Sequence, residues 1–363
     1  MPEYYVGLMS GTSLDGVDAV LAAARGRHFR LLERIHLSYP AKLRSRLLAL
    51  QQHGNNELHR AAVLANELSD LYADAVRRLL ARAEVGARAV AAIGCHGQTV
   101  RHRPGDGYTL QLVNGARLAE RSCIAVVCNF RSRDVAAGGE GAPLVPAFHR
   151  AMFGAARRSR IIVNVGGIAN LTLLPARGTV TGFDCGPGNC LLDAWSMHQR
   201  RMPFDAGGAW GARGRVIPRL LKKLLAHPFF RRRPPKSTGR EEFNLARVKR
   251  ALTGQERAVD VQATLLELTA TTIVQAVRTY CRGAREIYLC GGGARNRALL
   301  ARLTTLLPGT RVATTDALGI EPQHVEALAF AWLARQAFHN KPGNLPAVTG
   351  ARGPRVLGAI YPR

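Results

Sequence analysis

Residues 5–23 read Tyr-Val-Gly-Leu-Met-Ser-Gly-Thr-Ser-Leu-Asp-Gly-Val-Asp-Ala-Val-Leu-Ala-Ala. Two apolar runs, 5–9 and 17–23, flank a turn of small and hydroxylic residues at 10–16. This pattern predicts a strand, a hairpin loop and a second strand. Glycine lets the main chain approach a ligand closely, and consecutive amides form an anion-binding concavity. We therefore expect the loop to contact phosphate groups.

A second segment repeats this arrangement. Ile161–Val165 and Leu171–Leu174 flank the turn Gly166-Gly167-Ile168-Ala169-Asn170. Two such hairpins predict two similar halves that hold one nucleotide from opposite sides, so a phosphoryl-transfer enzyme is the leading hypothesis. The sequence contains no Walker, dinucleotide-binding or protein-kinase motif, which excludes the classes of enzyme that these motifs define.

The length of 363 residues predicts two domains. No apolar run reaches the roughly 18 residues that a membrane span needs. The first five residues, Met-Pro-Glu-Tyr-Tyr, do not resemble a signal peptide, so we expect a cytoplasmic protein without a membrane partner.

The formal net charge of +26 makes a nucleic-acid partner an alternative. The basic residues are mostly arginine and are spread along the chain, with one dense cluster at 231–236 and no nucleic-acid-binding motif. We therefore expect a solvated basic surface and no nucleic-acid partner. The seven cysteines form no Cys-x-x-Cys pair, which argues against a zinc site or a disulfide framework.

The apolar pattern predicts the remaining elements. Strands are expected at 30–37, 90–94, 124–128, 179–183 and 287–290, and helices at about 58–79, 261–281, 296–307 and 325–338. The stripe of the first helix consists of Leu58, Ala61, Ala65, Leu68, Tyr72, Ala75 and Leu79. The loop Gly138–Pro143 predicts a domain boundary near 135–160.

Asp184 follows the strand at 179–183 and precedes two glycines, in Asp184-Cys185-Gly186-Pro187-Gly188-Asn189. A carboxylate at the end of a strand can accept the proton of an attacking group. The alternative is a turn whose aspartate binds its own backbone. The two phosphate loops in the same chain favour the catalytic interpretation.

Other polar or glycine-rich segments also follow predicted strands. Gly291-Gly292-Gly293 could form a flat slot for adenine or a plain β–α turn, and Asn296 could contact the nucleotide or cap a helix. The segments 96–99 and 131–134 lie at strand ends, where ligands collect in α/β sheets. Arg131 and Asp134 could bind a sugar or form a surface ion pair.

Two further segments have ordinary structural explanations. Lys236–Asn244 could be a loop beside the substrate or nucleotide, or a helix cap with a capping-box glutamate. Glu321 and Glu326 begin the last helix, where a carboxylate complements the helix dipole. We retain Glu326 as a candidate site residue.

Together these motifs resemble the 1,6-anhydro-N-acetylmuramic acid kinase family, within the actin-like, hexokinase-like and Hsp70-like ATPases. The matching stretches are 9–18, 96–99, 141–149, 166–171, 184–189, 236–241, 291–293 and 326–332. They cover almost the whole chain, and the first is the most specific. Cys185 stands where threonine is common in the family, a difference that we do not expect to affect the chemistry.

The resemblance implies an α/β protein with two actin-like (RNase H-like) domains around a central nucleotide cleft that closes on substrate. The expected lobes are 1–134 and 135–339, with 340–363 packing back on the first. The implied reaction converts ATP, water and 1,6-anhydro-N-acetylmuramic acid, a small-molecule substrate, to ADP and N-acetylmuramic acid 6-phosphate. Mg²⁺ would bridge the phosphates, and the family suggests a homodimer.

The resemblance also implies residue roles. Asp184 would be the catalytic base. The ATP-binding residues would be Gly11, Thr12, Ser13, Leu14, Asp15, Gly16, Asp18, Gly166, Gly167, Asn170, Gly291, Gly292, Gly293 and Asn296. The sugar-binding residues would be His96, Gly97, Gln98, Thr99, Arg131, Asp134, Gly186 and Glu326. Asp15 would contact Mg²⁺ through water.

Two rival functions are a kinase of another amino sugar, such as N-acetylglucosamine, and an Hsp70-like or actin-like nucleotide switch. The first needs a substrate with a free hydroxyl. The second predicts an added substrate-binding domain or polymer contacts, and the 363 residues contain no such extension.

Overall fold

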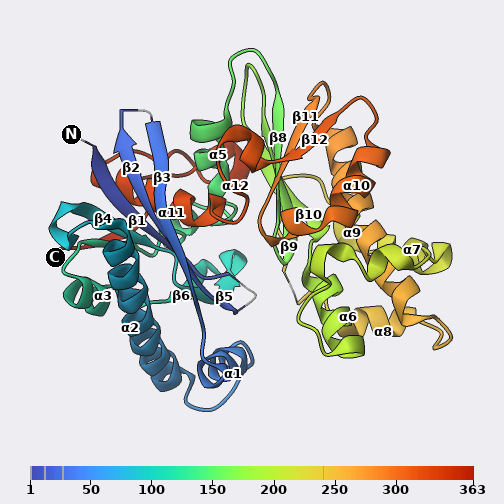
Figure 1. The fold of residues 1–363 in the computed structure, drawn as a ribbon, viewed down its shortest axis with the longest axis horizontal. Coiled ribbons are helices and arrows are strands. Elements are labelled where there is room, and N and C mark those ends of the chain that lie inside the picture. The colour runs from blue at the N-terminus through green and yellow to red at the C-terminus, as the bar shows by residue number, and fades with distance from the viewer. Residues whose placement is uncertain (1, 12–13, 27, 240) are drawn as a thin grey trace. The chain divides into compact units, whose positions relative to one another are not determined.

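The computed structural model describes residues 2–11, 14–26, 28–239 and 241–363. The chain divides into two compact units. Unit 1 runs to Met152 and resumes from His324 to Arg363, and unit 2 is the continuous segment Phe153–Gln323. The ribbon in Figure 1 shows the elements of each unit.

Unit 1 contains a six-stranded sheet in the order β13-β7-β4-β1-β2-β3. Its strands are β1 (Glu3–Met9), β2 (Gly16–Arg25), β3 (His28–Ser38), β4 (Val90–Cys95), β7 (Val126–Cys128) and β13 (Ala359–Tyr361). The strands β1, β2 and β3 form an antiparallel meander, and β4 and β7 continue the sheet in parallel. The C-terminal strand β13 closes the edge by pairing with β7.

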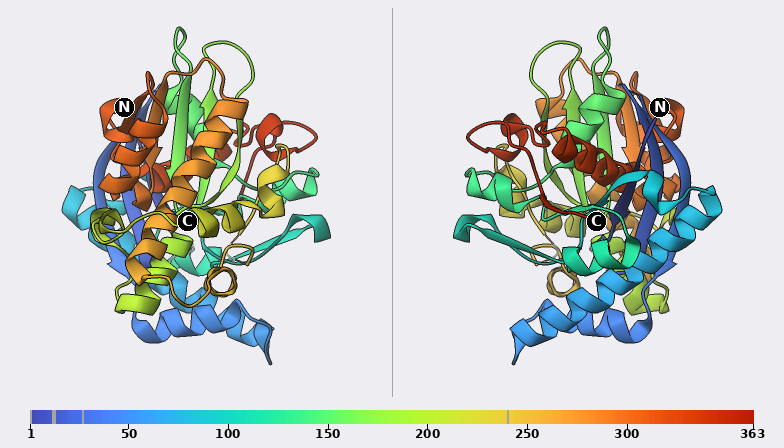
Figure 2. Two further views of the ribbon diagram at one scale, coloured as in Figure 1. Left: turned by 90° about the vertical axis from the view of Figure 1, so that its right-hand side faces the viewer. Right: turned by 90° about the vertical axis from the view of Figure 1, so that its left-hand side faces the viewer.

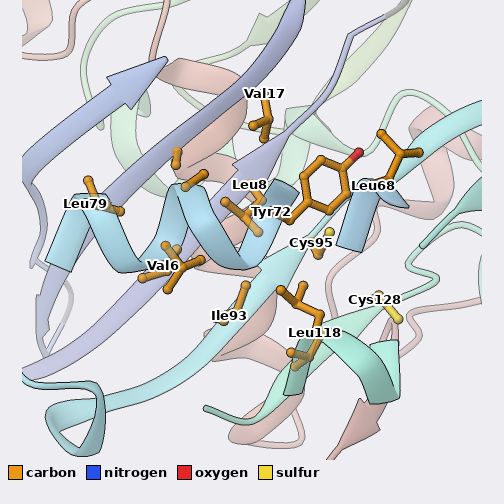
Figure 3. Close-up of a cluster of buried hydrophobic side chains, with 14 of the residues drawn as sticks. Val6, Leu8, Val17, Leu68, Tyr72, Leu79, Ile93, Cys95, Leu118 and Cys128 are labelled. Carbon is orange, nitrogen blue, oxygen red and sulfur yellow. The ribbon is translucent and has the colours of Figure 1, made fainter. Parts of the chain in front are cut away.

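The 27-residue helix α2 (Glu57–Ala83) packs its apolar stripe on one face of this sheet. Figure 3 shows Leu68, Tyr72 and Leu79 of α2 with Val6, Leu8 and Ile93 of the sheet. The predicted stripe is confirmed except at its first residue, because Leu58 is 89% exposed. The helix begins at Glu57, so Leu58 lies in a first turn that extends beyond the core.

Helix α11 (Val325–Phe338) packs on β1 and β4 through two glycines. A Cβ at Gly7 would lie 1.9 Å from the Ala327 oxygen, and one at Gly94 would lie 2.0 Å from the Phe330 oxygen. Successive side chains of a strand alternate between faces. Since Val6 and Leu8 belong to the core under α2, Gly7 turns to the opposite face, and the sheet lies between two helical layers.

A two-stranded hairpin, β5 (Gln98–Arg103) and β6 (Tyr108–Leu112), follows β4 and projects as a narrow ribbon (Figure 2). The remaining helices of this part of the chain are α1 (Ala41–Leu50), α3 (Gly115–Ser122), α4 (Ser132–Ala136), α5 (Val145–Phe153) and α12 (Pro346–Thr349).

Unit 2 contains a five-stranded sheet in the order β10-β9-β8-β11-β12. Its strands are β8 (Arg160–Val165), β9 (Ile168–Leu174), β10 (Thr181–Pro187), β11 (Glu286–Cys290) and β12 (Arg311–Thr314). Its helices are α6 (Cys190–Arg200), α7 (Pro218–Leu225), α8 (Leu245–Ala251), α9 (Ala258–Tyr280) and α10 (Arg297–Leu306). Buried residues of α9 and α10 pack with β8, β9 and β11 in one core, and α6, α7, α8 and the start of α9 form another.

The two sheets share one topology. Each has an antiparallel three-strand meander followed by two parallel strands, β3-β2-β1-β4-β7 in unit 1 and β10-β9-β8-β11-β12 in unit 2. The prediction of two similar α/β halves is therefore confirmed. In the described part of the chain, no helix is both long enough and apolar enough to cross a membrane.

The first division between the units, after Met152, falls in the range 135–160 in which the loop Gly138–Pro143 predicted a boundary. Two boundaries differ from those that the sequence predicted. The second division, after Gln323, precedes the expected lobe end at 339, because α11 packs on the unit 1 sheet. Strand β10 continues to Pro187, whereas the sequence predicted a loop from Asp184. Its pairing with β9 extends that far, so Asp184 lies within the strand.

Candidate functional site

The glycine turn of unit 2 joins β8 to β9 and is fastened to the end of β10. The amides of Gly188 and Cys190 donate to the Gly167 oxygen at 2.9 and 3.1 Å, and the Asn189 amide donates to the Gly166 oxygen at 2.8 Å. A Cβ at Gly188 would lie 2.4 Å from the Gly166 oxygen. The two predicted segments, 166–170 and 184–189, therefore form one structure.

Asp184 lies directly opposite Asn170 in the β9–β10 pair. Side chains of directly opposed residues in an antiparallel pair have Cβ atoms about 5 Å apart. The register shifts between Asp184 and Gly186, so Cys185 is the extra residue of a bulge. Bulges re-aim side chains beside functional sites. The fold thus brings together a predicted catalytic carboxylate and a predicted nucleotide-binding amide.

The loop 236–238 holds Asp184 at two points. The Asp184 amide donates to the Lys236 oxygen at 3.2 Å, and the Thr238 amide donates to Asp184 Oδ2 at 2.9 Å. The Lys236 ammonium lies 4.5 Å from the centre of the Phe229 ring and 5.8 Å from that of Phe183. Burial lowers the pKa of Lys236, while the neighbouring Asp184 carboxylate opposes this shift. The loop 236–238, for which the sequence allowed either a ligand contact or a helix cap, therefore orients Asp184.

Helix α9 contacts the end of β10 that holds the glycine turn. The hydroxyl of Thr269 lies 3.1 Å from the Pro187 oxygen and 3.0 Å from the Gly188 oxygen, to which it donates. Gly186 has φ +146°, and a Cβ there would lie 2.7 Å from the Phe230 ring. Sequence reasoning missed Thr269 because a threonine within a helix carries no local signal.

The turn Gly291–Gly293 packs against the end of β8. A Cβ at Gly291 would lie 2.3 Å from Asn164 Oδ1, and one at Gly293 would lie 2.3 Å from Val165 Cγ1. Gly291 also has φ +77°, which favours glycine. Close packing therefore requires glycine here, whatever the turn binds. Asn296 caps α10 by accepting from the Leu299 amide at 3.0 Å, as one of its two interpretations predicted.

In unit 1 the first hairpin joins β1 to β2, and Thr12 and Ser13 lie outside the described residues. Leu14 has φ +56° and its side chain is buried in the core, so only its main chain is available to a ligand. Asp15 is exposed. Gly16 begins β2, and a Cβ there would lie 2.4 Å from the Leu37 oxygen. The Asp18 carboxylate lies 2.9 Å from His36 Nδ1, and this hydrogen bond raises the pKa of His36.

In the segment 96–99, His96 and Gly97 connect β4 to β5, and Gln98 and Thr99 begin β5. Gly97 has φ +74°, and a Cβ there would lie 2.9 Å from the Leu112 oxygen. Gln98 donates to the Gly11 oxygen at 3.2 Å, which ties the turn to the predicted phosphate loop. Thr99 pairs with Gln111 in the β5–β6 hairpin.

His96 is buried against the Arg131 guanidinium. Its Nε2 lies 3.2 Å from Arg131 Nε and 3.0 Å from Arg131 Nη2. Burial and the positive charge of Arg131 lower the pKa of His96 to about 3, so the ring is neutral at pH 7. Nε2 therefore accepts from Arg131, and Nδ1 donates to the Ser10 oxygen at 3.3 Å.

Asp134 is fully buried, which excludes the interpretation of Asp134 as one partner of a surface ion pair. Its carboxylate accepts hydrogen bonds from the Gly141 amide, Asn344 and Thr349. Glu326 lies in the first turn of α11 and is half-buried.

The sequence pattern of one family, described as anhydro-N-acetylmuramic acid kinase, matches residues 3–363. The chain belongs to this family. It is 57% identical over 361 residues to the anhydro-N-acetylmuramic acid kinase of Nitrosomonas europaea, covering 99% of each chain. It is 56% identical to that of Thiobacillus denitrificans, covering 99% of this chain and 97% of the relative.

Solved structures that are similar to the chain are more distant. Component A of (R)-2-hydroxyglutaryl-CoA dehydratase from Acidaminococcus fermentans has a TM-score of 0.49 at 14% identity, covering 91% of this chain and 96% of that one. A ROK family glucokinase from Streptomyces griseus, in complex with glucose and AMPPNP, has a TM-score of 0.41 at 13% identity, covering 92% and 99%.

In this member of the anhydro-N-acetylmuramic acid kinase family, the residues assigned by resemblance form two sets. Unit 2 holds Asp184, Gly186, Gly166, Gly167, Asn170, Gly291, Gly292, Gly293 and Asn296. Unit 1 holds Gly11, Leu14, Asp15, Gly16, Asp18, His96, Gly97, Gln98, Thr99, Arg131, Asp134 and Glu326. Lys236, Thr238, Thr269 and Asn189 are additional residues that shape the unit 2 set.

Among the described residues, no group of three or more His, Cys, Asp or Glu side chains could hold a metal ion. Mg²⁺ in kinases is bound mainly by substrate phosphates and one or two carboxylates, so it does not need such a group. The exposed carboxylate of Asp15, in the loop of the first hairpin, fits that requirement.

Proposed function

We propose that this chain opens the anhydro bridge of 1,6-anhydro-N-acetylmuramic acid and phosphorylates O6, with ATP as phosphoryl donor. The observation that carries the proposal is the placement of Asp184. It lies opposite Asn170 on the β9–β10 pair, and its carboxylate is oriented by the Thr238 amide, in a chain of this family.

The anhydro sugar has no free 6-hydroxyl, because O6 is bonded to C1. A base therefore has no proton to remove from O6, and water must be activated instead. Asp184 accepts a proton from the water that attacks C1. A C1–O bond forms, the C1–O6 bond breaks, and O6 attacks the γ-phosphorus while the bond to the β-phosphate oxygen breaks. The layout is that of an inverting glycosidase in which the phosphoryl group replaces the usual acid.

The remaining roles follow the two sets of residues. The main-chain amides of the hairpins at 11–16 and 166–167 bind phosphate oxygens, with Asn170 and Asp18 beside them. The turn Gly291–Gly293 binds the adenosine. Arg131 binds the lactyl carboxylate, supported by the turn at 96–99. Asp15 would hold Mg²⁺ through a water molecule, and the bound ion would supply positive charge to the phosphate oxygens.

Replacement of the proposed base is the decisive experiment. Asp184→Asn keeps the shape of the side chain and removes its basicity, so turnover should fall by about 10²–10⁴-fold. The product of the native enzyme in ¹⁸O-water, analysed by mass spectrometry after rapid quenching, should carry the label on the sugar carbon C1 and not in the phosphate. Asp106→Asn, at an exposed aspartate of the β5–β6 turn, is the matched control and should keep full activity.

Near-native turnover in Asp184→Asn would show that another group activates the water. Label in the phosphate would show that water attacks ATP instead of the sugar. A kinase of N-acetylglucosamine is not favoured, because the similar relatives are anhydro-N-acetylmuramic acid kinases over nearly their full length. ADP release measured with both sugars separates the two functions. The homodimer and the cytoplasmic location stay predictions.

A further inference from the structure

The C-terminal segment of the chain is joined to the loop that follows Arg131. The Glu140 amide donates to the Thr349 oxygen at 2.7 Å, and the Arg352 amide donates to the Ala137 oxygen at 2.9 Å. Both partners of each bond belong to unit 1. Residues more than 200 positions apart in the sequence therefore form one structure beside Arg131.

Asp134 is the centre of this structure. It is 0% exposed, and its two oxygens accept hydrogen bonds from three residues, one in the loop after Arg131 and two in the C-terminal segment. The Gly141 amide lies 2.8 Å from Oδ2, while Asn344 Nδ2 and Thr349 Oγ1 lie 2.7 and 2.8 Å from Oδ1. A buried carboxylate is stable only with such donors. These contacts make Asp134 an internal brace, that is, a buried side chain that holds two segments of the chain together. A carboxylate that binds sugar would instead need an oxygen accessible to the ligand.

Gly141 connects this brace to Arg131. Its amide donates to Asp134, and its carbonyl accepts from Arg131 Nη1 at 2.8 Å. On the other side of the guanidinium, Nε and Nη2 donate to His96 Nε2. The plane of the guanidinium is therefore determined by contacts on two sides, and Asp134 holds one of them in place.

We propose that Asp134 is a positioning residue that sets the orientation of Arg131 through Gly141, and that Asn344 and Thr349 make the C-terminal segment part of this brace. The consequence is selectivity for a sugar that carries a lactyl carboxylate. This inference rests on the proposed function, in which Arg131 binds that carboxylate. Bidentate recognition of a carboxylate depends on the plane of the guanidinium, so a small rotation reduces it.

The test compares two sugars that differ only in the lactyl group. Dissociation constants of 1,6-anhydro-N-acetylmuramic acid and 1,6-anhydro-N-acetylglucosamine are measured by calorimetry on the full chain, with a non-hydrolysable ATP analogue present. The native protein should prefer the lactyl sugar. Asp134→Asn places an amide N–H among three donors and should reduce that preference by about tenfold or more, the scale of a hydrogen bond to a charged group.

Thr349→Val is a milder variant in case Asp134→Asn does not fold, and it should reduce the preference by about threefold. Asp106→Asn should leave it unchanged. Equal weakening of both sugars in Asp134→Asn and Thr349→Val would overturn the inference, because a merely structural role lowers both affinities together. An unchanged preference in Arg131→Ala would overturn it too. If selectivity behaves as expected but the native protein forms no sugar phosphate, the proposed function fails and the positioning role stands.

Discussion

The pKa of His36, on β3, depends on its contact with Asp18 on the neighbouring strand β2. Its Nδ1 lies 2.9 Å from Asp18 Oδ1, and this hydrogen bond, together with the charges of Asp18 and Asp15, raises the pKa of His36 above 6.5 despite partial burial. We expect the His36 ring resonance, followed by NMR without nucleotide, to titrate above 6.5 in the native protein. Asp18→Asn should bring the midpoint down.

The sign of the effect on stability follows from linkage. The folded pKa of His36 is raised, so the stabilisation from its ion pair is complete below pH 6.5 and is lost as the pH rises through the folded pKa. Asp106→Asn should not move the resonance. A native midpoint at or below 6.5 would contradict the hydrogen bond between these two side chains.

The sequence could identify site residues by type but not by partner. Asp184 and Asn170 were both predicted, yet their direct opposition depends on the register of β9 and β10 and on the bulge at Cys185. For Asp134 the residues alone left open a sugar contact or a surface ion pair with Arg131, and the family resemblance implied the sugar contact. Its partners Asn344 and Thr349 lie about 200 residues away, where no local pattern points to them.

At the scale of elements, the packing of α11 on the sheet depends on two glycines. A Cβ at Gly7 would overlap the Ala327 carbonyl, and one at Gly94 would overlap the Phe330 carbonyl, so the helix backbone itself would have to move. Gly7→Ala and Gly94→Ala should each reduce the free energy of unfolding by at least about 2 kcal/mol, as overpacking does. Urea denaturation followed by circular dichroism measures the change.

Gly86→Ala is the matched control, because a Cβ there meets no atom within 4 Å and its φ is −71°. It should change the free energy of unfolding by less than about 0.5 kcal/mol. A loss at Gly7→Ala no larger than that of Gly86→Ala would show that the helix does not contact β1 as closely as described.

Long elements with a clear apolar period were predictable, and short ones were not. Helix α11 has the predicted bounds, whereas α2 continues past the predicted end at 79 to Ala83 and leaves Leu58 exposed. Strands β12 and β13 have four and three residues, too few to show alternation. The projecting hairpin β5–β6 is mainly polar, and most of its side chains are at least partly exposed. It therefore contains no apolar run from which a strand could be predicted.

At the scale of the whole molecule, the repeated sheet topology was predictable from the two glycine hairpins, whereas the assignment of the last helix to a unit was not. The segment 325–338 has the pattern of an apolar helix, which does not say which sheet it covers. Only the close approach to Gly7 and Gly94 assigns it to unit 1. Unit 1 is therefore built from both ends of the chain, and unit 2 is one continuous insertion.

This connectivity predicts different behaviour for fragments. Residues 153–323 contain the whole five-stranded sheet and its two helical cores, so this fragment should fold alone, with dispersed amide resonances and a cooperative thermal transition. Residues 1–152 lack α11 and β13, which exposes the face of β1 and β4 at Gly7 and Gly94 and leaves β7 without its edge partner. This fragment should not unfold cooperatively, and a peptide of residues 324–363 should restore the transition. A cooperative melt of 1–152 by itself would show that the C-terminal segment is an accessory to unit 1 and not part of its core.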